Sequence, residues 1–337
     1  MNKIEEYIVQ YVSQYPKDIV KIAAEHFNIS VQAVNKHIKK LIDANLIEAT
    51  GKTRSRSYRI KTKQFLLHYK IEKGLSESGV WIQDIEKYMP TKPNVHNIWN
   101  YVFSEMFNNA IEHSCGTRIN VYILKENKKT HMLIQDDGIG IFKNIQNKFN
   151  LLNEHEAILE LSKGKLTTDK QHHSGEGVFF SSRAVDMFFI ESHGIVFEHN
   201  TDKDVLHDKT ELEPTKGTTV AMVLSDDSNR VLKDVFDEFA GDNYGFDKTV
   251  IPIELARYGD DNLVSRSQAR RVLNRVTLFK HVVFDFDNVP QIGQAFADEI
   301  FRVFANANPG VKLDYINAND NVIAMINRAK VSNINEL

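Results

Sequence analysis

The stretch SEMFNNAIEHS, residues 104–114, combines polar and apolar side chains at helical spacing. At about 100° per residue, its polar side chains share one arc of a helix: Glu105, Asn108, Asn109 and Glu112. The opposite arc is apolar and includes the residue before the stretch: Phe103, Met106, Phe107, Ala110 and Ile111. This spacing is equally typical of a solvated helix face and of a binding site. Features elsewhere in the chain must decide between the two interpretations.

The composition limits the class of protein. A chain of 337 residues predicts two or three domains, and a net charge of -3 gives no overall attraction to nucleic acid or membrane. The single cysteine, Cys115, excludes an internal disulfide framework and is typical of a reducing compartment. The N-terminal residues lack a signal-peptide pattern, and no run approaches the roughly 18 apolar residues of a membrane span. We therefore expect a cytoplasmic protein without a membrane segment.

Residues 1–63 predict three short helices followed by a hairpin. DIVKIAAEHFNIS (18–30) and VQAVNKHIKKLIDANLI (31–47) predict two helices joined by a tight turn, with Ser30 as the N-cap of the second. The whole arrangement resembles a winged helix-turn-helix. The expected hairpin, or wing, is basic and carries no acid from residue 52 onward: Lys52, Arg54, Arg56, Arg59, Lys61 and Lys63.

This basic patch on an acidic chain favours contact with double-stranded DNA. The candidate contacts lie on the outward side of the second helix and on the wing: Gln32, Asn35, Lys36, Lys39, Arg54 and Arg56. Winged helices also serve as protein-docking or dimerisation modules. A regulatory protein partner and a homodimer therefore remain open alternatives.

From 64 to 99 the chain is expected to be a mostly helical lead-in, and MPTKPNV (89–95) interrupts regular structure before a helix over 100–114. The following pattern predicts strands over 117–127, 130–138, 187–194, 195–200 and 217–225. Helical stretches are expected over 142–163 and 177–186. These elements predict an α/β sandwich, with a mixed or antiparallel sheet covered by helices on one face. We assign it to residues 64–245.

Residues 246–337 show a separate alternation of predicted strands and helices. Expected strands begin at residues 248, 281 and 312, and expected helices begin at residues 265, 295 and 320. This βαβαβα order predicts a small sheet with parallel strands covered by helices. The chain as a whole is therefore expected to be an α+β and α/β multidomain protein.

Three further motifs accompany the opening helix: DDGIGI (136–141), HHSGEGVFF (172–180) and KGTTVAMVL (216–224). Together, in this order, they resemble the four motifs of the GHKL ATPase family. That family includes gyrase-type topoisomerases, heat-shock chaperones, mismatch-repair ATPases, histidine kinases and anti-sigma-factor kinases. Four motifs in order are more specific than a lone glycine loop. The resemblance implies ATP and Mg²⁺ as ligands.

The resemblance also implies roles at the phosphate end of the nucleotide. Glu105 matches the general base, which orients and deprotonates the group that attacks the γ-phosphate. Asn109 matches the residue whose amide oxygen binds Mg²⁺. Gly175 and Gly177 precede a helix whose free N–H groups can meet phosphates. Lys163 and Lys165 could reach phosphates from a closing lid, although solvated loop lysines are the simpler interpretation.

At the base end, Asp136 matches the carboxylate that accepts a hydrogen bond from the adenine amino group. Gly138 and Gly140 would let the backbone turn tightly beside the base. Thr218 matches a hydroxyl that helps to hold the adenine. The resemblance thus implies a role for each of these four residues.

The closing section resembles a STAS-like domain of anti-sigma-factor antagonists. The resemblance rests on VVFDFDNVPQIGQAFADEIFRVF (282–304) and INANDNVIAMINRA (316–329). In phosphorylated antagonists the turn before the helix carries a serine, whereas residues 287–301 contain no Ser or Thr, and Gly293 and Gln294 occupy that place. Phosphorylation of this turn is therefore not expected, and a docking surface for the ATP domain is the alternative.

Three functions agree with these motifs. The leading hypothesis is a switch that binds Mg-ATP, hydrolyses it, and couples nucleotide state to DNA or partner binding. The second is a serine/threonine protein kinase of the anti-sigma-factor type that acts on a separate partner. The third is a transcription factor that senses nucleotide without catalysis. The residues do not decide whether phosphate passes to water or to a protein.

Overall fold

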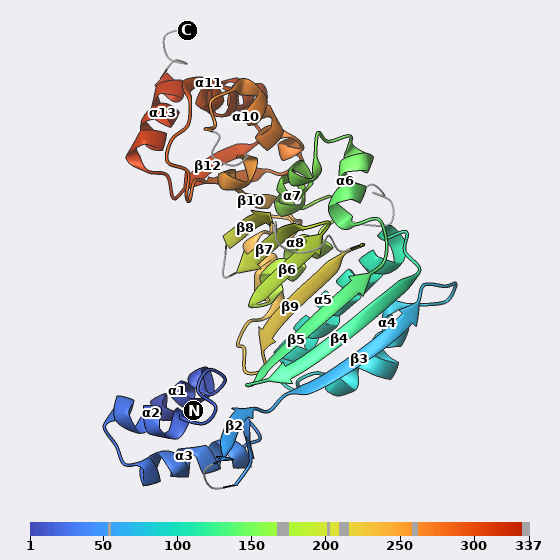
Figure 1. Cartoon of the computed structure of the whole chain (residues 1–337). Helices are drawn as coiled ribbons and strands as arrows, with labels where there is room; N and C mark the ends of the chain where they lie inside the picture. The colour runs from blue at the N-terminus through green and yellow to red at the C-terminus, as the bar shows by residue number, and fades with distance from the viewer. Residues whose placement is uncertain (53–54, 167–174, 201–202, 209–215, 258–261, 332–337) are drawn as a thin grey trace.

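The computed structural model describes residues 1–52, 55–166, 175–200, 203–208, 216–257 and 262–331. A large sheet occupies the middle of the molecule, with the N-terminal helices at one end and a small α/β body at the other (Figure 1). The N-terminal core is a separate cluster, whereas the middle and C-terminal sections share one continuous core.

The N-terminal section contains the three helices and the hairpin that the sequence predicts. They are α1 (Lys3–Tyr11), α2 (Ile19–Phe27), α3 (Val31–Asp43), β1 (Ile47–Thr50) and β2 (Ser57–Ile60). The side chain of Ser30 accepts a hydrogen bond from the N–H of Ala33, which confirms the predicted N-cap. The two strands pair antiparallel, and Tyr58 on β2 packs into the helical core.

The predicted helical lead-in is wrong for its first part. Residues Lys63–Lys70 form strand β3, which pairs with β4 along its whole length. Along β3 the side chains of Phe65, Leu67 and Tyr69 are half-buried, and those between them are exposed. This alternation and the ladder of cross-strand pairs favour a strand. Short helical turns follow: α4 (Glu77–Val80), η2 (Trp81–Ile85) and η3 (Glu86–Tyr88).

The central sheet has the order β3-β4-β5-β9-β6-β7-β8, and all its pairings are antiparallel. Its other strands are β4 (Arg118–Glu126), β5 (Lys129–Asp136), β6 (Met187–Ser192), β7 (Ile195–Asn200), β8 (Lys203–Asp208) and β9 (Thr219–Ser225). Of the two predicted alternatives, a mixed or an antiparallel sheet, the described residues form the antiparallel one, so the mixed sheet is wrong. Hairpins join three of its six neighbouring pairs: β4–β5, β6–β7 and β7–β8. β8 was not predicted, since KDVLHD is short and largely polar.

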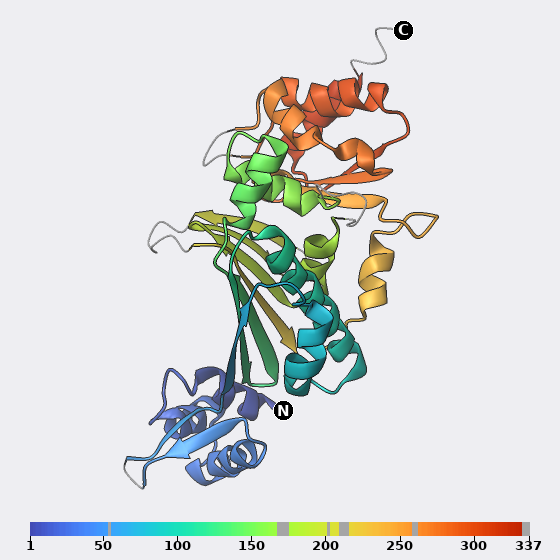
Figure 2. The same ribbon diagram turned by 90° about the vertical axis from the view of Figure 1, so that its right-hand side faces the viewer.

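Helices cover one face of this sheet (Figure 2). The longest is α5 (Pro93–His113), which begins seven positions before the expected start because Pro93 occupies its first turn, where no N–H donor is needed. The expected stretch 142–163 is two helices, α6 (Ile141–Phe149) and α7 (Glu154–Lys163), separated by the left-handed Asn150. Helices α8 (Gly177–Ala184) and α9 (Leu232–Glu238) complete the layer.

The C-terminal section confirms the predicted βαβαβα order. Strands β10 (Lys248–Pro252), β11 (His281–Asp285) and β12 (Lys312–Ile316) form a parallel sheet in sequence order. The helical elements around them are η4 (Ile253–Ala256), α10 (Arg266–Leu273), η5 (Val276–Leu278), α11 (Gln294–Asp298), η6 (Glu299–Phe304), α12 (Ala305–Ala307) and α13 (Asp320–Val331).

Candidate functional site

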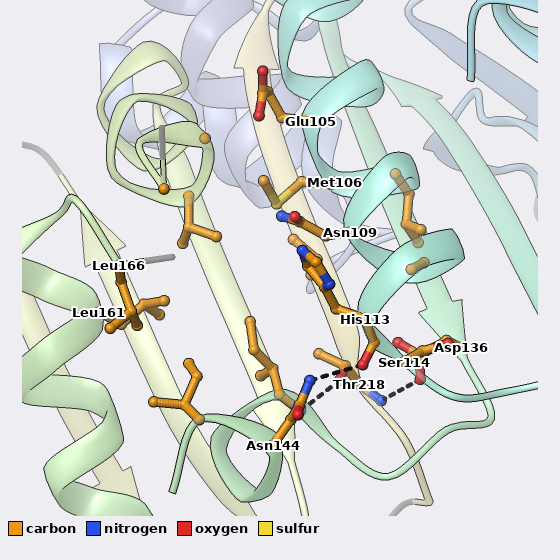
Figure 3. Close-up of a pocket in the computed structure, with 18 of the residues that line it drawn as sticks. Glu105, Met106, Asn109, His113, Ser114, Asp136, Asn144, Leu161, Leu166 and Thr218 are labelled. Carbon is orange, nitrogen blue, oxygen red and sulfur yellow. Dashed lines mark hydrogen bonds between the residues drawn. The ribbon is translucent and has the colours of Figure 1, made fainter. Parts of the chain in front are cut away.

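A cavity of about 290 Å³ lies between α5, the end of β5, α6, the segment after α7, the start of α8 and β9. Six of the eight predicted nucleotide-site residues line it: Glu105, Asn109, Asp136, Gly175, Gly177 and Thr218. They come from all four motifs, so the fold gathers into one cavity residues that are far apart in the sequence (Figure 3).

Helix α5 supplies one wall of the cavity. Glu105, Asn109 and His113 recur every four residues and line the cavity, whereas Phe103 and Phe107 are fully buried in the core. Figure 3 shows Glu105 near one end of this wall, with Asn109 and His113 farther along it. Glu105 and Asn109 of the polar arc therefore face the cavity together with His113, whereas Asn108 and Glu112 do not line it.

Asp136 is buried at the other end of the cavity, with only 6% of its surface exposed. Its Oδ1 accepts hydrogen bonds from the N–H groups of Gly138 at 2.9 Å and Thr218 at 3.3 Å. Burial raises the pKa of Asp136 because it disfavours the charged form, and these hydrogen bonds partly oppose that effect. The structure thus holds a buried carboxyl at the edge of the cavity.

The adjacent Asp137 has a different environment and does not line the cavity. Its carboxylate accepts hydrogen bonds from Thr117 N at 2.6 Å, Thr117 Oγ1 at 2.8 Å and Arg118 N at 3.0 Å. The bonds from Thr117 lower the pKa of Asp137 well below its usual range. Asp137 therefore fastens the start of β4 to the turn after β5.

Gly138 and Gly140 do not line the cavity but shape the turn beside it. A Cβ on Gly138 would stand 2.0 Å from the carbonyl oxygen of Ser114, so only glycine fits there. Gly140 has a φ of +85° and precedes α6. Gly217, also at +85°, was not predicted, and its Cβ would stand 2.2 Å from the carbonyl oxygen of Asp136. Its position directly before Thr218 was the sequence signal that could have identified Gly217.

Thr218 connects two walls of the cavity. Its N–H donates to Asp136, and its Oγ1 accepts a hydrogen bond from Ile141 N, the first residue of α6, at 2.9 Å. The hydroxyl therefore holds the start of α6 beside the end of β5. A contact between this hydroxyl and an adenine stays a prediction.

Several cavity residues were not predicted from the sequence. His113 follows Asn109 by one helical turn, which was a usable signal, whereas nothing local marked the α6 residues Asn144 and Lys148. Asn144 is buried, and its Nδ2 donates to the carbonyl oxygen of His113 at 2.8 Å (Figure 3). This hydrogen bond holds the end of α5 against α6.

The two lysines expected on a lid lie elsewhere. Lys163 is 0% exposed, and its Nζ lies 2.7 Å from Glu160 Oε1, so it is neither a solvated loop residue nor a phosphate ligand in this structure. Burial lowers the pKa of Lys163, while Glu160 opposes that shift. Lys165 donates to the carbonyl oxygen of Leu278 at 2.9 Å. Both lysines are therefore bound to protein atoms.

The DNA-contact candidates on α3 lie on its surface. Gln32, Asn35, Lys36 and Lys39 are exposed, whereas Val34 and Ile38 on the same helix are buried in the N-terminal core. Arg56 beside β2 is also exposed, and Arg54 lies outside the described residues. The geometry thus leaves these four side chains of α3 accessible.

The described part of the chain contains neither a membrane span nor a metal cluster. Within these ranges, no helix combines the length and the apolar character that crossing a membrane requires. Among the same residues, no group of three or more His, Cys, Asp or Glu side chains could hold a metal ion.

Two parts of the chain match known protein families. Residues 96–228 match the family described as histidine kinase-, DNA gyrase B-, and HSP90-like ATPase. Residues 268–322 match the family described as STAS-like domain of unknown function (DUF4325). No curated protein matches the chain. The chain therefore contains an ATPase domain of the GHKL type and, after it, a STAS-like domain.

Proposed function

We propose that this protein is a regulatory switch that binds Mg-ATP in the cavity beside α5 and hydrolyses it. The observation that carries the proposal is the convergence of all four motifs on one cavity, in a domain whose family implies ATP as a ligand. The cavity is concave, partly apolar and furnished with a few convergent polar groups, as expected of a small-molecule site.

The nucleotide would lie along α5. Asp136 and Thr218, at one end, offer oxygen atoms to the base, while Glu105, Asn109 and the N-terminal residues of α8 lie toward the other end (Figure 3). The free N–H groups at the start of α8 suit the phosphate groups. We assign the general base to Glu105, since a carboxylate within reach of the attacking water can accept its proton.

The residues at the phosphate end fit Mg²⁺ that arrives with the nucleotide. Asn109 and Glu105 offer oxygen atoms from one face of α5, and no cluster of acidic or histidine side chains among the described residues could hold the ion alone. Mg²⁺ prefers oxygen ligands and keeps several waters, so phosphates and solvent would complete its shell. When bound, the ion would neutralise the charge on the phosphates.

The proposal is tested by isothermal titration with ATP, with and without Mg²⁺, and by release of labelled phosphate. Glu105→Ala should keep ATP binding but lose turnover, whereas Asn109→Ala should lose the Mg²⁺-dependent part of binding. Equal turnover in the two variants and the unmodified protein would refute the assignment. Label that appears on an added protein, rather than as free phosphate, would instead favour the protein kinase.

We further propose that the N-terminal section is a winged helix-turn-helix that contacts double-stranded DNA through α3. The support is its order of three helices and a hairpin, together with the exposed residues Lys36 and Lys39 on the outward side of α3. Basic side chains on such a helix can reach phosphates and bases in the major groove. A nucleotide-dependent change in this contact would make the protein a transcription regulator.

A further inference from the structure

One short segment belongs both to the wall of the cavity and to the contact with the STAS-like body, defined here as the described residues of 248–331. Leu161 and Leu166 line the cavity. Between them, Lys163 and Lys165 donate hydrogen bonds to carbonyl oxygens of the STAS-like body. The segment 161–166 therefore cannot move without affecting both.

The contact is centred on the buried pair of Lys163 and Glu160. Lys163 Nζ also donates to the carbonyl oxygens of Arg271 at 3.1 Å and Asn274 at 3.0 Å, which lie about one turn apart at the end of α10. The hydroxyl of Thr249 on β10 donates to the carbonyl oxygen of Lys163 at 2.8 Å. The ammonium group of this lysine thus donates both to Glu160 on α7 and to carbonyl oxygens of the STAS-like body.

Arg275 of the STAS-like body also binds the segment 161–166. Its guanidinium donates to Glu160 Oε2 at 2.8 Å and to the carbonyl oxygen of Gly164 at 3.0 Å, and it also bonds to the carbonyl oxygen of Lys165. Asn274 Nδ2 adds a bond to Glu160 Oε1 at 3.1 Å. A carboxylate that is 3% exposed is costly to bury unless such partners satisfy it.

The two facing helices are complementary in charge. α7 presents Glu156 and Glu160, α10 presents Arg271, and the turn after α10 presents Arg275. Arg271 lies 3.3 Å from Glu156, and both of these side chains are largely buried. These paired charges therefore form a specific interface between α7 and the STAS-like body.

Direct contacts lead from this interface to the proposed catalytic residue. The N–H of Leu166 donates to the carbonyl oxygen of Gly175 at 3.0 Å, and a Cβ on Gly175 would stand 2.5 Å from the carbonyl carbon of Leu166. Two residues later, Gly177 lies against the carboxylate of Glu105. Displacement of the segment 161–166 would therefore shift the start of α8 at the phosphate end.

We propose that the STAS-like body regulates nucleotide binding in cis, by holding the segment 161–166 in the conformation that forms the wall of the cavity. This inference rests on the proposed ATP site and adds its regulator. While the STAS-like body holds the segment, the wall is already ordered when the nucleotide arrives. When the STAS-like body releases the segment, the nucleotide has to order it, which weakens binding.

The first test measures ATP affinity of the full chain by titration calorimetry. Arg275→Ala and Glu160→Gln, which weaken the contact from opposite sides, should each reduce affinity by a factor in the usual range of coupling, about 5- to 150-fold. Arg270→Ala is the matched control, since Arg270 bonds to Glu299 at 2.7 Å within the STAS-like body. Its ATP affinity should equal that of the unmodified protein.

The second test measures hydrogen exchange with and without ATP. Coupling is reciprocal, so ATP should slow exchange at the end of α10 as well as in α7 of the unmodified protein. In Arg275→Ala and Glu160→Gln, exchange over 161–166 should rise while β11 stays protected.

The outcomes separate this inference from the proposed function. An unmodified protein that binds no ATP would overturn the proposed function and the inference with it. An unmodified protein that binds ATP, with equal or tighter binding in Glu160→Gln, would overturn the cis regulation alone. Loss of affinity confined to Arg275→Ala, with β11 unprotected, would also overturn it, because the effect would then come from unfolding.

Discussion

Gly177, the first residue of α8, lies directly against the carboxylate of Glu105 on α5: a Cβ on Gly177 would stand 2.0 Å from Glu105 Oε2. The approach brings the proposed general base to the N-terminal end of a helix, where phosphates are favoured. Burial raises the pKa of the neighbouring Tyr101, and the charges of Glu105 and Glu176 add to that shift. The carboxylates of Glu105 and Glu176 therefore both lie close enough to Tyr101 to affect it.

The first prediction concerns this close approach. Gly177→Ala should push the Glu105 carboxylate aside and lower the rate of ATP hydrolysis by about 100-fold, since a misplacement near 1 Å can cost that much. ATP affinity should fall less, because Asp136 and Thr218 are unchanged. Release of labelled phosphate measures the rate, and titration calorimetry with ATP measures the affinity. Gly310→Ala is the matched control, since no atom lies within 4 Å of its added Cβ. Turnover equal to the control would contradict the proposed geometry.

The second prediction concerns the buried carboxyl. Asp136→Asn should reduce ATP affinity by about 10- to 100-fold, since hydrogen bonds to charged groups contribute roughly 1.5–3 kcal/mol. The same change should raise the free energy of unfolding by about 1 kcal/mol, because asparagine removes the cost of burying a charge while its Oδ1 still accepts from Gly138. Titration with ATP and thermal unfolding measure the two effects. A variant that binds ATP normally would exclude Asp136 as the adenine acceptor.

The pH dependence of Asp136 follows from the direction of its shift. A raised pKa means that the folded state favours the protonated form, so this group's contribution to stability is greatest at low pH and is lost as pH rises through the folded pKa. The difference in stability between Asp136→Asn and the unmodified protein should therefore shrink as pH falls. A difference that grows on acidification would contradict the assignment.

The third prediction uses the adjacent Asp137 as a contrast. Asp137→Ala removes the bonds to Thr117 and Arg118 and should lower the free energy of unfolding by about 1–2 kcal/mol, with ATP affinity unchanged. Because its pKa is lowered, this stabilisation is present above the unfolded pKa and is lost as pH falls toward the folded value. Urea unfolding at neutral and acidic pH measures it. Weaker ATP binding at unchanged stability would reverse the roles of the two aspartates.

The elements that were predicted correctly are those whose signal is local. The polar arc of α5, the N-cap Ser30 and the alternating residues of β4 and β5 are all visible within a few positions of sequence. The order of the motifs also indicated that Glu105, Asp136 and Thr218 would meet. Their spacing could not show which neighbours would complete the cavity, and Asn144 and Lys148 were missed for that reason.

The failures arise where distant parts of the chain decide the structure. β3 is a strand because β4 pairs with it, and the lead-in alone does not show that partner. Lys163 resembled a loop lysine in the sequence, but α10 and β10 cover it, and its hydrogen-bond acceptors include residues more than one hundred positions away. A buried lysine of this kind can be predicted only when its partners are known.

The last prediction concerns the N-terminal section. If α3 contacts DNA, Lys36→Ala combined with Lys39→Ala should weaken binding to a mixed-sequence duplex and reduce the slope of log affinity against log salt by about 2, because each lost phosphate contact removes about 0.9. Fluorescence anisotropy over a series of salt concentrations measures the slope. Lys233→Ala on α9 is the control, since it removes an exposed positive charge that lies outside the N-terminal section. If the double variant and the control share one slope, α3 is not the DNA-contact surface, and docking of a protein partner becomes the better interpretation.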